Sequence, residues 1–196
     1  MNLPNKLTIS RFILTVAFLA VMFSQVRFHE TIALGLFAAA GISDFLDGQI
    51  ARRRNLITNF GILMDPLADK IMVCSAFIAF VGLKWIAAWM VVIVVGRELA
   101  ITGLRLLAAS KNVVLAAEGY GKHKTVSQII AIISIFVLHS YNQWGPAGQA
   151  IFGFPVFGQP WVNRFTELAK WIAVVLTFYS GWMYLWKNRA LYLQDL

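Results

Sequence analysis

Residues 43–70 read SDFLDGQIARRRNLITNFGILMDPLADK, and this stretch joins the end of one apolar segment to the start of the next. It contains four of the nine acidic residues in the chain: Asp44, Asp47, Asp65 and Asp69. Aspartates three or four positions apart project from one face of a helix. The short connection between the two pairs predicts two antiparallel neighbouring helices, which would bring the carboxylates together.

The composition of the whole chain indicates a membrane protein. Of the 196 residues, 59% are hydrophobic and 13% are charged, whereas soluble domains average about 45–50% apolar and about 25% charged residues. The apolar residues recur in runs of about 20, the length that spans roughly 30 Å of hydrocarbon. Six spans are predicted, at residues 7–25, 31–53, 64–82, 86–109, 125–142 and 166–187. Residues 143–160 are rich in Gly and Pro and should resist a continuous helix.

We therefore expect an all-α, polytopic bundle of six transmembrane helices, with residues 1–196 forming a single membrane domain. Thirteen of the 17 Lys and Arg residues fall on one side of the predicted spans and four on the other. Basic residues concentrate on the cytoplasmic side, so both termini are predicted to be cytoplasmic. The same bias explains the net charge of +8 without nucleic acid as a partner. The single cysteine, Cys74, excludes a disulfide framework.

The four aspartates are candidate ligands for divalent cations. Carboxylates within membrane segments are costly and usually line a polar cavity or pair with cations. Mg²⁺ takes carboxylates together with phosphate oxygens, and two-metal sites hold their ions about 3.5–4 Å apart. Ion pairs with Lys70 and the arginines at 52–54 are the structural alternative. A divalent-cation transporter is the functional alternative, but its carboxylates should lie near the bilayer midplane rather than at the predicted cytoplasmic edge.

The spacing across residues 44–69 is D-x2-D-G-x2-A-R-x8-G-x3-D-x3-D. It resembles the signature of the CDP-alcohol phosphatidyltransferase family at every defined position. The resemblance implies a six-helix membrane bundle, usually homodimeric, with a polar cavity open to the cytoplasm, in a bacterial cytoplasmic membrane. It implies that the four aspartates bind Mg²⁺ or Mn²⁺ as two ions, and that Asp69 also takes the proton of the acceptor hydroxyl. The implied reaction transfers a phosphatidyl group from CDP-diacylglycerol to an alcohol and releases CMP.

The same resemblance implies contacts with CDP-diacylglycerol from residues around the aspartates. The implied set is Gly48, Arg52, Thr58 and Gly61, with Asn5 and Thr8 of an N-terminal N-x-x-T motif. Glycine allows a ligand to approach the backbone closely, and the planar guanidinium of arginine matches phosphate oxygens. Close helix packing at the two glycines and a helix cap at Asn5 are the structural alternatives.

Four further cations lie in the fourth and fifth apolar segments or at their edges: Arg97, Arg105, Lys122 and Lys124. The two arginines are eight positions apart, about 80° around a helix, so they can border one cavity. A cationic pocket would suit an acceptor that carries its own phosphate. Arg97, deep in its segment and beside Glu98, is expected in a buried ion pair or a ligand site. Snorkelling to anionic head groups is the alternative for these side chains.

Three further stretches of the sequence bear on the identity of the acceptor alcohol. The stretches LPNKLTISR, GRELAITGLR and GKHKT resemble members of the family that use sn-glycerol 3-phosphate. Inositol phosphate, serine and phosphatidylglycerol remain alternative acceptors. The expected partners are therefore CDP-diacylglycerol, glycerol 3-phosphate, membrane lipids and a second copy of the chain.

Overall fold

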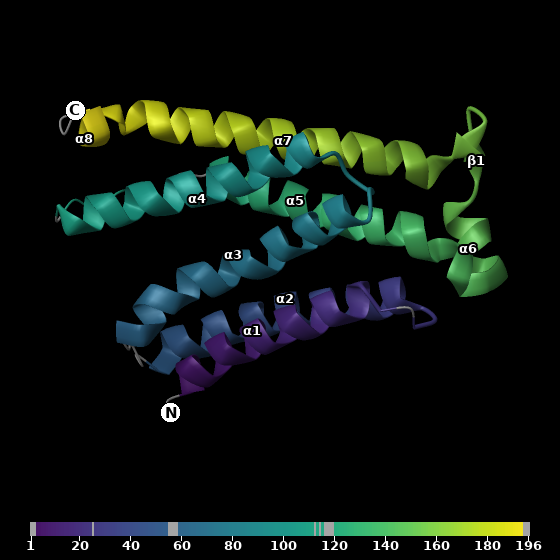
Figure 1. Cartoon of the computed structure of the whole chain (residues 1–196), viewed down its shortest axis with the longest axis horizontal. Helices are drawn as coiled ribbons and strands as arrows, with labels where there is room; N and C mark the ends of the chain where they lie inside the picture. The colour runs from purple at the N-terminus through teal and green to yellow at the C-terminus, as the bar shows by residue number, and fades with distance from the viewer. Residues whose placement is uncertain are drawn as a thin grey trace.

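The computed structural model describes the backbone of residues 3–24, 26–54, 59–111, 113, 115 and 120–193. Side chains are described for residues 9–24, 26–43, 70–111, 113, 115 and 121–192. Within this part of the chain six helices have 20 or more residues: α1 (Leu3–Met22), α2 (His29–Arg54), α3 (Asn59–Gly82), α4 (Ala88–Ser110), α5 (Tyr120–Ser140) and α7 (Trp161–Lys187). They run back and forth along one long axis, so both ends of the chain lie at the same end of the bundle (Figure 1).

The six long helices coincide with the six apolar segments of the sequence, which confirms a mainly helical chain. Several helices begin up to five residues before the predicted position, as at Asn59, Tyr120 and Trp161. Hydropathy marks only the apolar part of a helix, while polar residues can still form its first turns. Two described helical stretches, Gly121–Phe152 and Trp161–Lys187, are both long and apolar enough to cross a membrane.

The distribution of basic residues follows the two ends of the bundle. Arg27 lies in the turn after α1 and Lys84 in the turn after α3, and both turns lie opposite the end that holds the termini (Figure 1). At the end that holds the termini, α2 and α4 finish and α3 and α5 begin. The two sides that the sequence distinguishes by their number of basic residues therefore correspond to the two ends of the structure.

Four phenylalanines form an aromatic core toward the end of the bundle opposite the termini. Phe18 of α1, Phe37 of α2, Phe80 of α3 and Phe136 of α5 contact one another, with ring centroids 5.0–6.4 Å apart. All four side chains are buried. Tilted and edge-to-face aromatic pairs add stability beyond the area they bury. This core joins four helices at the end away from the motif aspartates.

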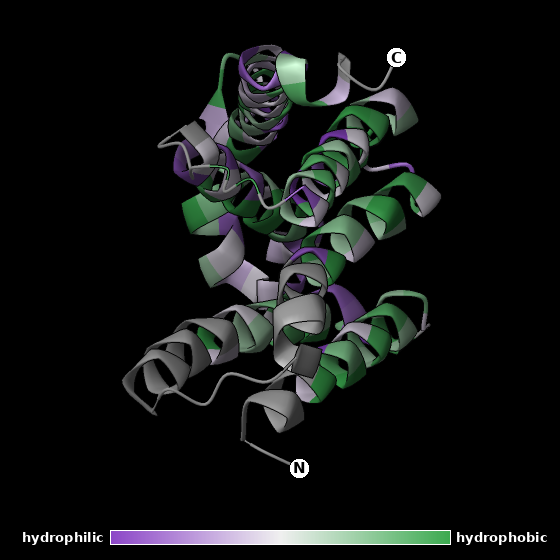
Figure 2. Cartoon of the chain, turned by 90° about the vertical axis from the view of Figure 1, so that its left-hand side faces the viewer, coloured by the Kyte–Doolittle hydropathy of each residue, from purple (hydrophilic) through white to green (hydrophobic). Residues whose placement is uncertain are grey.

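Large hydrophobic side chains also cover the outside of the long helices. Val92 and Leu99 of α4 are 69% and 66% exposed, and Phe178 and Trp182 of α7 are 58% and 57% exposed. Figure 2 shows hydrophobic residues, in green, on outward-facing parts of the helices as well as in the interior. Helices that are apolar all round are typical of a chain surrounded by lipid. The exposed surface therefore agrees with the membrane character predicted from the composition.

The Gly- and Pro-rich region after α5 contains only short elements, as its sequence predicted. They are a 3-10 turn η1 (Tyr141–Trp144), helix α6 (Gly145–Phe152) and the strands β1 (Pro155–Val156) and β2 (Gln159–Pro160). The strands pair in antiparallel register through a turn at Phe157 and Gly158, whose φ values are 52° and 81°. Two successive positive φ values are typical of the tight turns that match the twist of a hairpin. A last helix, α8 (Arg189–Leu193), follows α7.

Candidate functional site

The four motif aspartates lie on two consecutive helices at the end of the bundle that holds the termini. Asp44 and Asp47 are on α2, and Asp65 and Asp69 are on α3. Asp44 is ten residues before the end of α2 and Asp69 is ten residues after the start of α3. The two helices run in opposite directions, contact each other and both pack against α1 (Figure 1). The predicted antiparallel arrangement of the helices is therefore confirmed.

The side chains of this motif lie outside the described residues, so convergence of the carboxylates stays a prediction. The same holds for the side chains of Asn5 and Thr8 on α1, and for Gly48 and Arg52 on α2 and Gly61 on α3 as contacts of the nucleotide lipid. Thr58, between α2 and α3, is not among the described residues. Where side chains are described, no group of three or more His, Cys, Asp or Glu residues forms a metal site.

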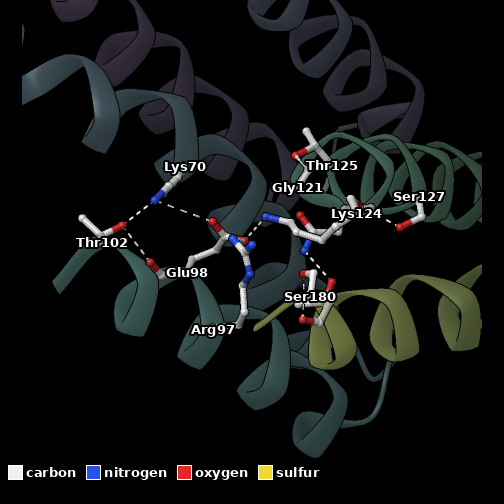
Figure 3. A network of polar contacts seen from close by, with 11 residues as sticks. Lys70, Arg97, Glu98, Thr102, Gly121, Lys124, Thr125, Ser127 and Ser180 are labelled. Carbon is white, nitrogen blue, oxygen red and sulfur yellow. Dashed lines mark hydrogen bonds and ion pairs between the residues drawn. The ribbon is translucent and has the colours of Figure 1, made fainter. Parts of the chain in front are cut away.

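A buried carboxylate, Glu98 of α4, is the centre of the described part of the site. Its residue surface is 5% exposed. Lys124 Nζ on α5 donates a hydrogen bond to Glu98 Oε1, and Lys70 Nζ on α3 lies 3.7 Å from Glu98 Oε2 (Figure 3). Arg97 Nη1, on α4 itself, lies 3.4 Å from Glu98 Oε1. Cations from three helices therefore share one carboxylate.

Thr102 holds the Lys70 ammonium at a second point. Lys70 Nζ donates a hydrogen bond to Thr102 Oγ1, and Thr102 Oγ1 in turn donates to the main-chain oxygen of Glu98 at 2.7 Å (Figure 3). Glu98 and Thr102 are four residues apart on α4, so they lie on the same face of the helix. Because Lys70 directly follows Asp69 in the chain, these contacts link the aspartate-bearing helix α3 to α4.

Among the side chains that the structure describes, the network holds more positive than negative charge. Lys70, Arg97 and Lys124 supply three positive charges against the single negative charge of Glu98. Arg97 Nε is also buried and has no hydrogen-bond partner among the described residues. A buried donor without a partner costs free energy, and excess cations in a membrane protein usually line a polar cavity or a ligand path. The arrangement therefore suits a small anionic ligand such as a phosphate group.

The structure brings some of the predicted acceptor residues together and separates others. Arg97 and Lys124 meet at Glu98, and the expected buried pair of Arg97 with Glu98 is confirmed. Arg105 lies two turns further along α4, is exposed, and donates from Nε to Tyr184 Oη of α7 at 3.4 Å. Lys122 is exposed on α5 and takes part in none of the ion pairs found among the described side chains.

Sequence reasoning missed Lys70, Thr102 and Tyr184 as parts of this site. The sequence indicated Lys70 only as an ion-pair partner of the aspartates. A lysine inside an apolar segment, however, itself indicates a polar neighbour. Thr102 and Tyr184 carried no such signal, because both residue types are common in membrane helices. Their place follows from how α3 and α7 pack against α4.

Comparison with known proteins places the chain among transferases. A family profile described as CDP-alcohol phosphatidyltransferase matches residues 1–179. A protein of Bacillus subtilis (strain 168) named CDP-diacylglycerol–glycerol-3-phosphate 3-phosphatidyltransferase is 39% identical, and the match covers 95% of each chain. Proteins of the same name from Rickettsia typhi and Mycoplasma pneumoniae are 32% and 35% identical, over 93% and 82% of this chain and 94% and 79% of their own. This chain belongs to the CDP-alcohol phosphatidyltransferase family.

Proposed function

We propose that this chain transfers the phosphatidyl group of CDP-diacylglycerol to a hydroxyl of sn-glycerol 3-phosphate, giving phosphatidylglycerophosphate and CMP. The names of relatives that match nearly the whole chain support this reaction. The structural observation that carries it is the cationic network around the buried Glu98, made by Arg97, Lys124 and Lys70, the last on the helix that bears Asp69. The matching family profile and the relatives named above are transferases, which favours an enzyme over a divalent-cation transporter.

Asp44, Asp47, Asp65 and Asp69 would hold divalent cations, Mg²⁺ or Mn²⁺, as two ions. The donor set fits, because carboxylate oxygens are the ligands these hard cations prefer, and two adjoining helices carry two carboxylates each. When bound, such ions neutralise charge on the pyrophosphate and stabilise the leaving CMP. Asp69 would accept the proton of the attacking hydroxyl, a role that needs its carboxylate within hydrogen-bond reach of that group.

The nucleotide lipid would be held by the residues that surround these aspartates in the motif. Arg52 supplies a guanidinium for phosphate oxygens, while Gly48 and Gly61 leave space for the head group beside the helix backbone. Thr58, Asn5 and Thr8 would complete the contacts. All of these residues lie on α1, on α2, on α3 or in the connection between α2 and α3.

The phosphate of the acceptor would be held by the cations of α4 and α5. Arg97 and Lys124 are buried or nearly so and already gather at Glu98, and Lys70 adds a third charge from α3. Arg105 and Lys122 are more exposed and would attract the anion at the mouth of the site. A phosphorylated acceptor matches this excess of positive charge better than serine, which brings no phosphate.

We further propose that the six long helices span a bacterial cytoplasmic membrane, with both termini and the active site on the cytoplasmic side and a second copy of the chain forming a homodimer. The common end of both termini and the two charge-separated ends of the bundle support the orientation. The apolar outer faces of the long helices support contact with membrane lipids (Figure 2).

The reaction is tested by following CMP release from purified protein with CDP-diacylglycerol, Mg²⁺ and one acceptor at a time. The acceptors are glycerol 3-phosphate, inositol phosphate, serine and phosphatidylglycerol. We expect CMP with glycerol 3-phosphate, no CMP after chelation by EDTA, and recovery when Mg²⁺ or Mn²⁺ is restored. Release with another acceptor alone would overturn the assigned acceptor, and no release with any of the four would overturn the reaction.

A further inference from the structure

Helix α7 contacts both of the arginines on α4, although no residue after 140 entered the site predicted from the sequence. Gly181 of α7 packs directly against the aliphatic stem of Arg97. A Cβ atom built on Gly181 would lie 2.7 Å from Arg97 Cγ and 3.6 Å from Arg97 Cβ. Carbon atoms do not approach to 2.7 Å without repulsion. Only glycine at this position leaves the Arg97 stem where it is.

The second contact lies three residues further along α7. Arg105 Nε donates to Tyr184 Oη at 3.4 Å, and the Arg105 guanidinium carbon lies 5.7 Å from the centroid of the Tyr184 ring. Residues 181 and 184 are on one face of a helix, and the Tyr184 side chain is buried. One face of α7 therefore supports two cationic side chains of α4 at two successive turns.

The support at Gly181 leaves hydrogen-bonding capacity on Arg97 unused. The Arg97 side chain is 13% exposed, and among the described residues its side chain donates one hydrogen bond, the 3.4 Å contact from Nη1 to Glu98 Oε1. Its buried Nε lacks a partner among the described residues. A guanidinium fixed by packing rather than by hydrogen bonds keeps its donors available for a ligand, and a preorganised fork binds phosphate oxygens with less loss of side-chain entropy.

We propose that Gly181 and Tyr184 are positioning residues that hold Arg97 and Arg105 for the phosphate of the acceptor. This inference rests on the proposed function, because there Arg97 binds that phosphate and Arg105 attracts it at the mouth of the site. Gly181 acts by leaving room and Tyr184 by a hydroxyl and a ring face. Neither residue belongs to the proposed contacts of the nucleotide lipid. Substituting either one should therefore change binding of the acceptor and not binding of CDP-diacylglycerol.

The Gly181→Ala variant tests the packing contact. Its new methyl group displaces the Arg97 stem, so the KM for glycerol 3-phosphate should rise by about tenfold, as for one weakened charge-assisted hydrogen bond. The KM for CDP-diacylglycerol should stay within about twofold. Gly103→Ala on α4 is the matched control, since a Cβ there meets nothing within 4 Å. An unchanged KM for the acceptor in Gly181→Ala, or an equal rise in Gly103→Ala, would overturn the role of Gly181.

A double-mutant cycle shows whether the effect passes through Arg97. In an Arg97→Ala background the Cγ atom is gone, so Gly181→Ala should have no further effect on the acceptor KM. If Arg97→Ala leaves too little turnover, the midpoint of thermal unfolding replaces KM. Gly181→Ala should then lower the midpoint in the wild-type background and leave it unchanged beside Arg97→Ala. Equal effects in both backgrounds would contradict the contact.

The Tyr184→Phe variant tests the hydroxyl while it keeps the ring. We expect the acceptor KM to rise by a few-fold, because the hydrogen bond to the exposed Arg105 is long and a cation–π contact remains. Tyr184→Leu should raise the acceptor KM further. An acceptor KM that is equal in wild type and both variants would contradict a positioning role for Tyr184. Wild-type protein that releases no CMP with glycerol 3-phosphate would overturn the proposed function instead, and the unfolding cycle would still report on Gly181 and Arg97.

Discussion

Lys70 Nζ on α3 lies 3.7 Å from Glu98 Oε2 on α4. Lys70 directly follows Asp69, the proposed base, and Glu98 directly follows Arg97, a proposed ligand of the acceptor phosphate. One ion pair thus connects the helix that would deprotonate the acceptor hydroxyl to the helix that would hold the acceptor phosphate. The distance between the proposed base and the proposed phosphate site would therefore be set by how α3 and α4 are held together.

Removing the charge of Glu98 should destabilise the bundle. In Glu98→Gln the buried Lys124 ammonium keeps its place without a counter-ion, and breaking a buried pair in this way costs about 3–5 kcal/mol. The free energy of unfolding in detergent, measured by denaturant titration or from the shift in thermal midpoint, gives the comparison with wild type.

Glu167→Gln is the control for that loss of charge. Glu167 is 60% exposed and pairs with Lys170 one turn away on α7, so its removal should change stability by about 0–1 kcal/mol. Lys170 keeps a hydrogen bond from Nζ to the main-chain oxygen of Trp85 at 3.3 Å. Equal losses in the two variants would show that Glu98 is not the centre of a buried network.

The contact between α5 and α7 depends in part on one buried polar pair. Gln128 Nε2 donates to Thr177 Oγ1 at 2.9 Å, and both side chains are buried. Thr177→Val removes the acceptor at nearly constant shape and should lower stability by about 1 kcal/mol, the range found for such bonds between membrane helices. Adding Gln128→Leu removes the orphaned donor, so the double variant should be more stable than Thr177→Val alone in thermal unfolding. A double variant that is less stable than Thr177→Val would contradict this.

Neutralising Asp69, the proposed base and a proposed metal ligand, should reduce the rate of CMP release. In Asp69→Asn the hydroxyl loses its proton acceptor, and kcat for CMP release should fall by about 10²–10⁴-fold, the usual contribution of general base catalysis. Asp195→Asn makes the same chemical change outside the motif and should keep kcat near the wild-type value. A kcat within threefold of wild type for Asp69→Asn would exclude it as the base.

The fold could be predicted well from the sequence because lipid imposes a simple rule: helices with enough apolar residues to span the hydrocarbon. The starts of α3, α5 and α7 were predicted five residues late. Polar residues such as Asn59 and Lys122 belong to those helices but lie outside the hydropathy signal. The antiparallel placement of α2 and α3 was also predictable, because a short connection leaves little choice of direction.

The partners of Glu98 could not be predicted in the same way. A carboxylate within an apolar segment signalled a buried pair, and its neighbour Arg97 was an evident partner. The contacts with Lys124 and Lys70 depend on how α3 and α5 are rotated against α4, which no local pattern of residues encodes. Gly181 is a further case, because a glycine in a membrane helix becomes a specific support only when its neighbour across the interface is known.

The selectivity between glycerol 3-phosphate and glycerol tests the central claim most directly, since the two acceptors differ only in the phosphate. We predict that Lys124→Met lowers kcat/KM for glycerol 3-phosphate by about 10–100-fold, the worth of one charge-assisted hydrogen bond, and leaves kcat/KM for glycerol within about twofold. Lys84→Met, at the opposite end of the bundle, should leave both values near wild type. An equal fall for the two acceptors in Lys124→Met would contradict a phosphate site built from the cations around Glu98.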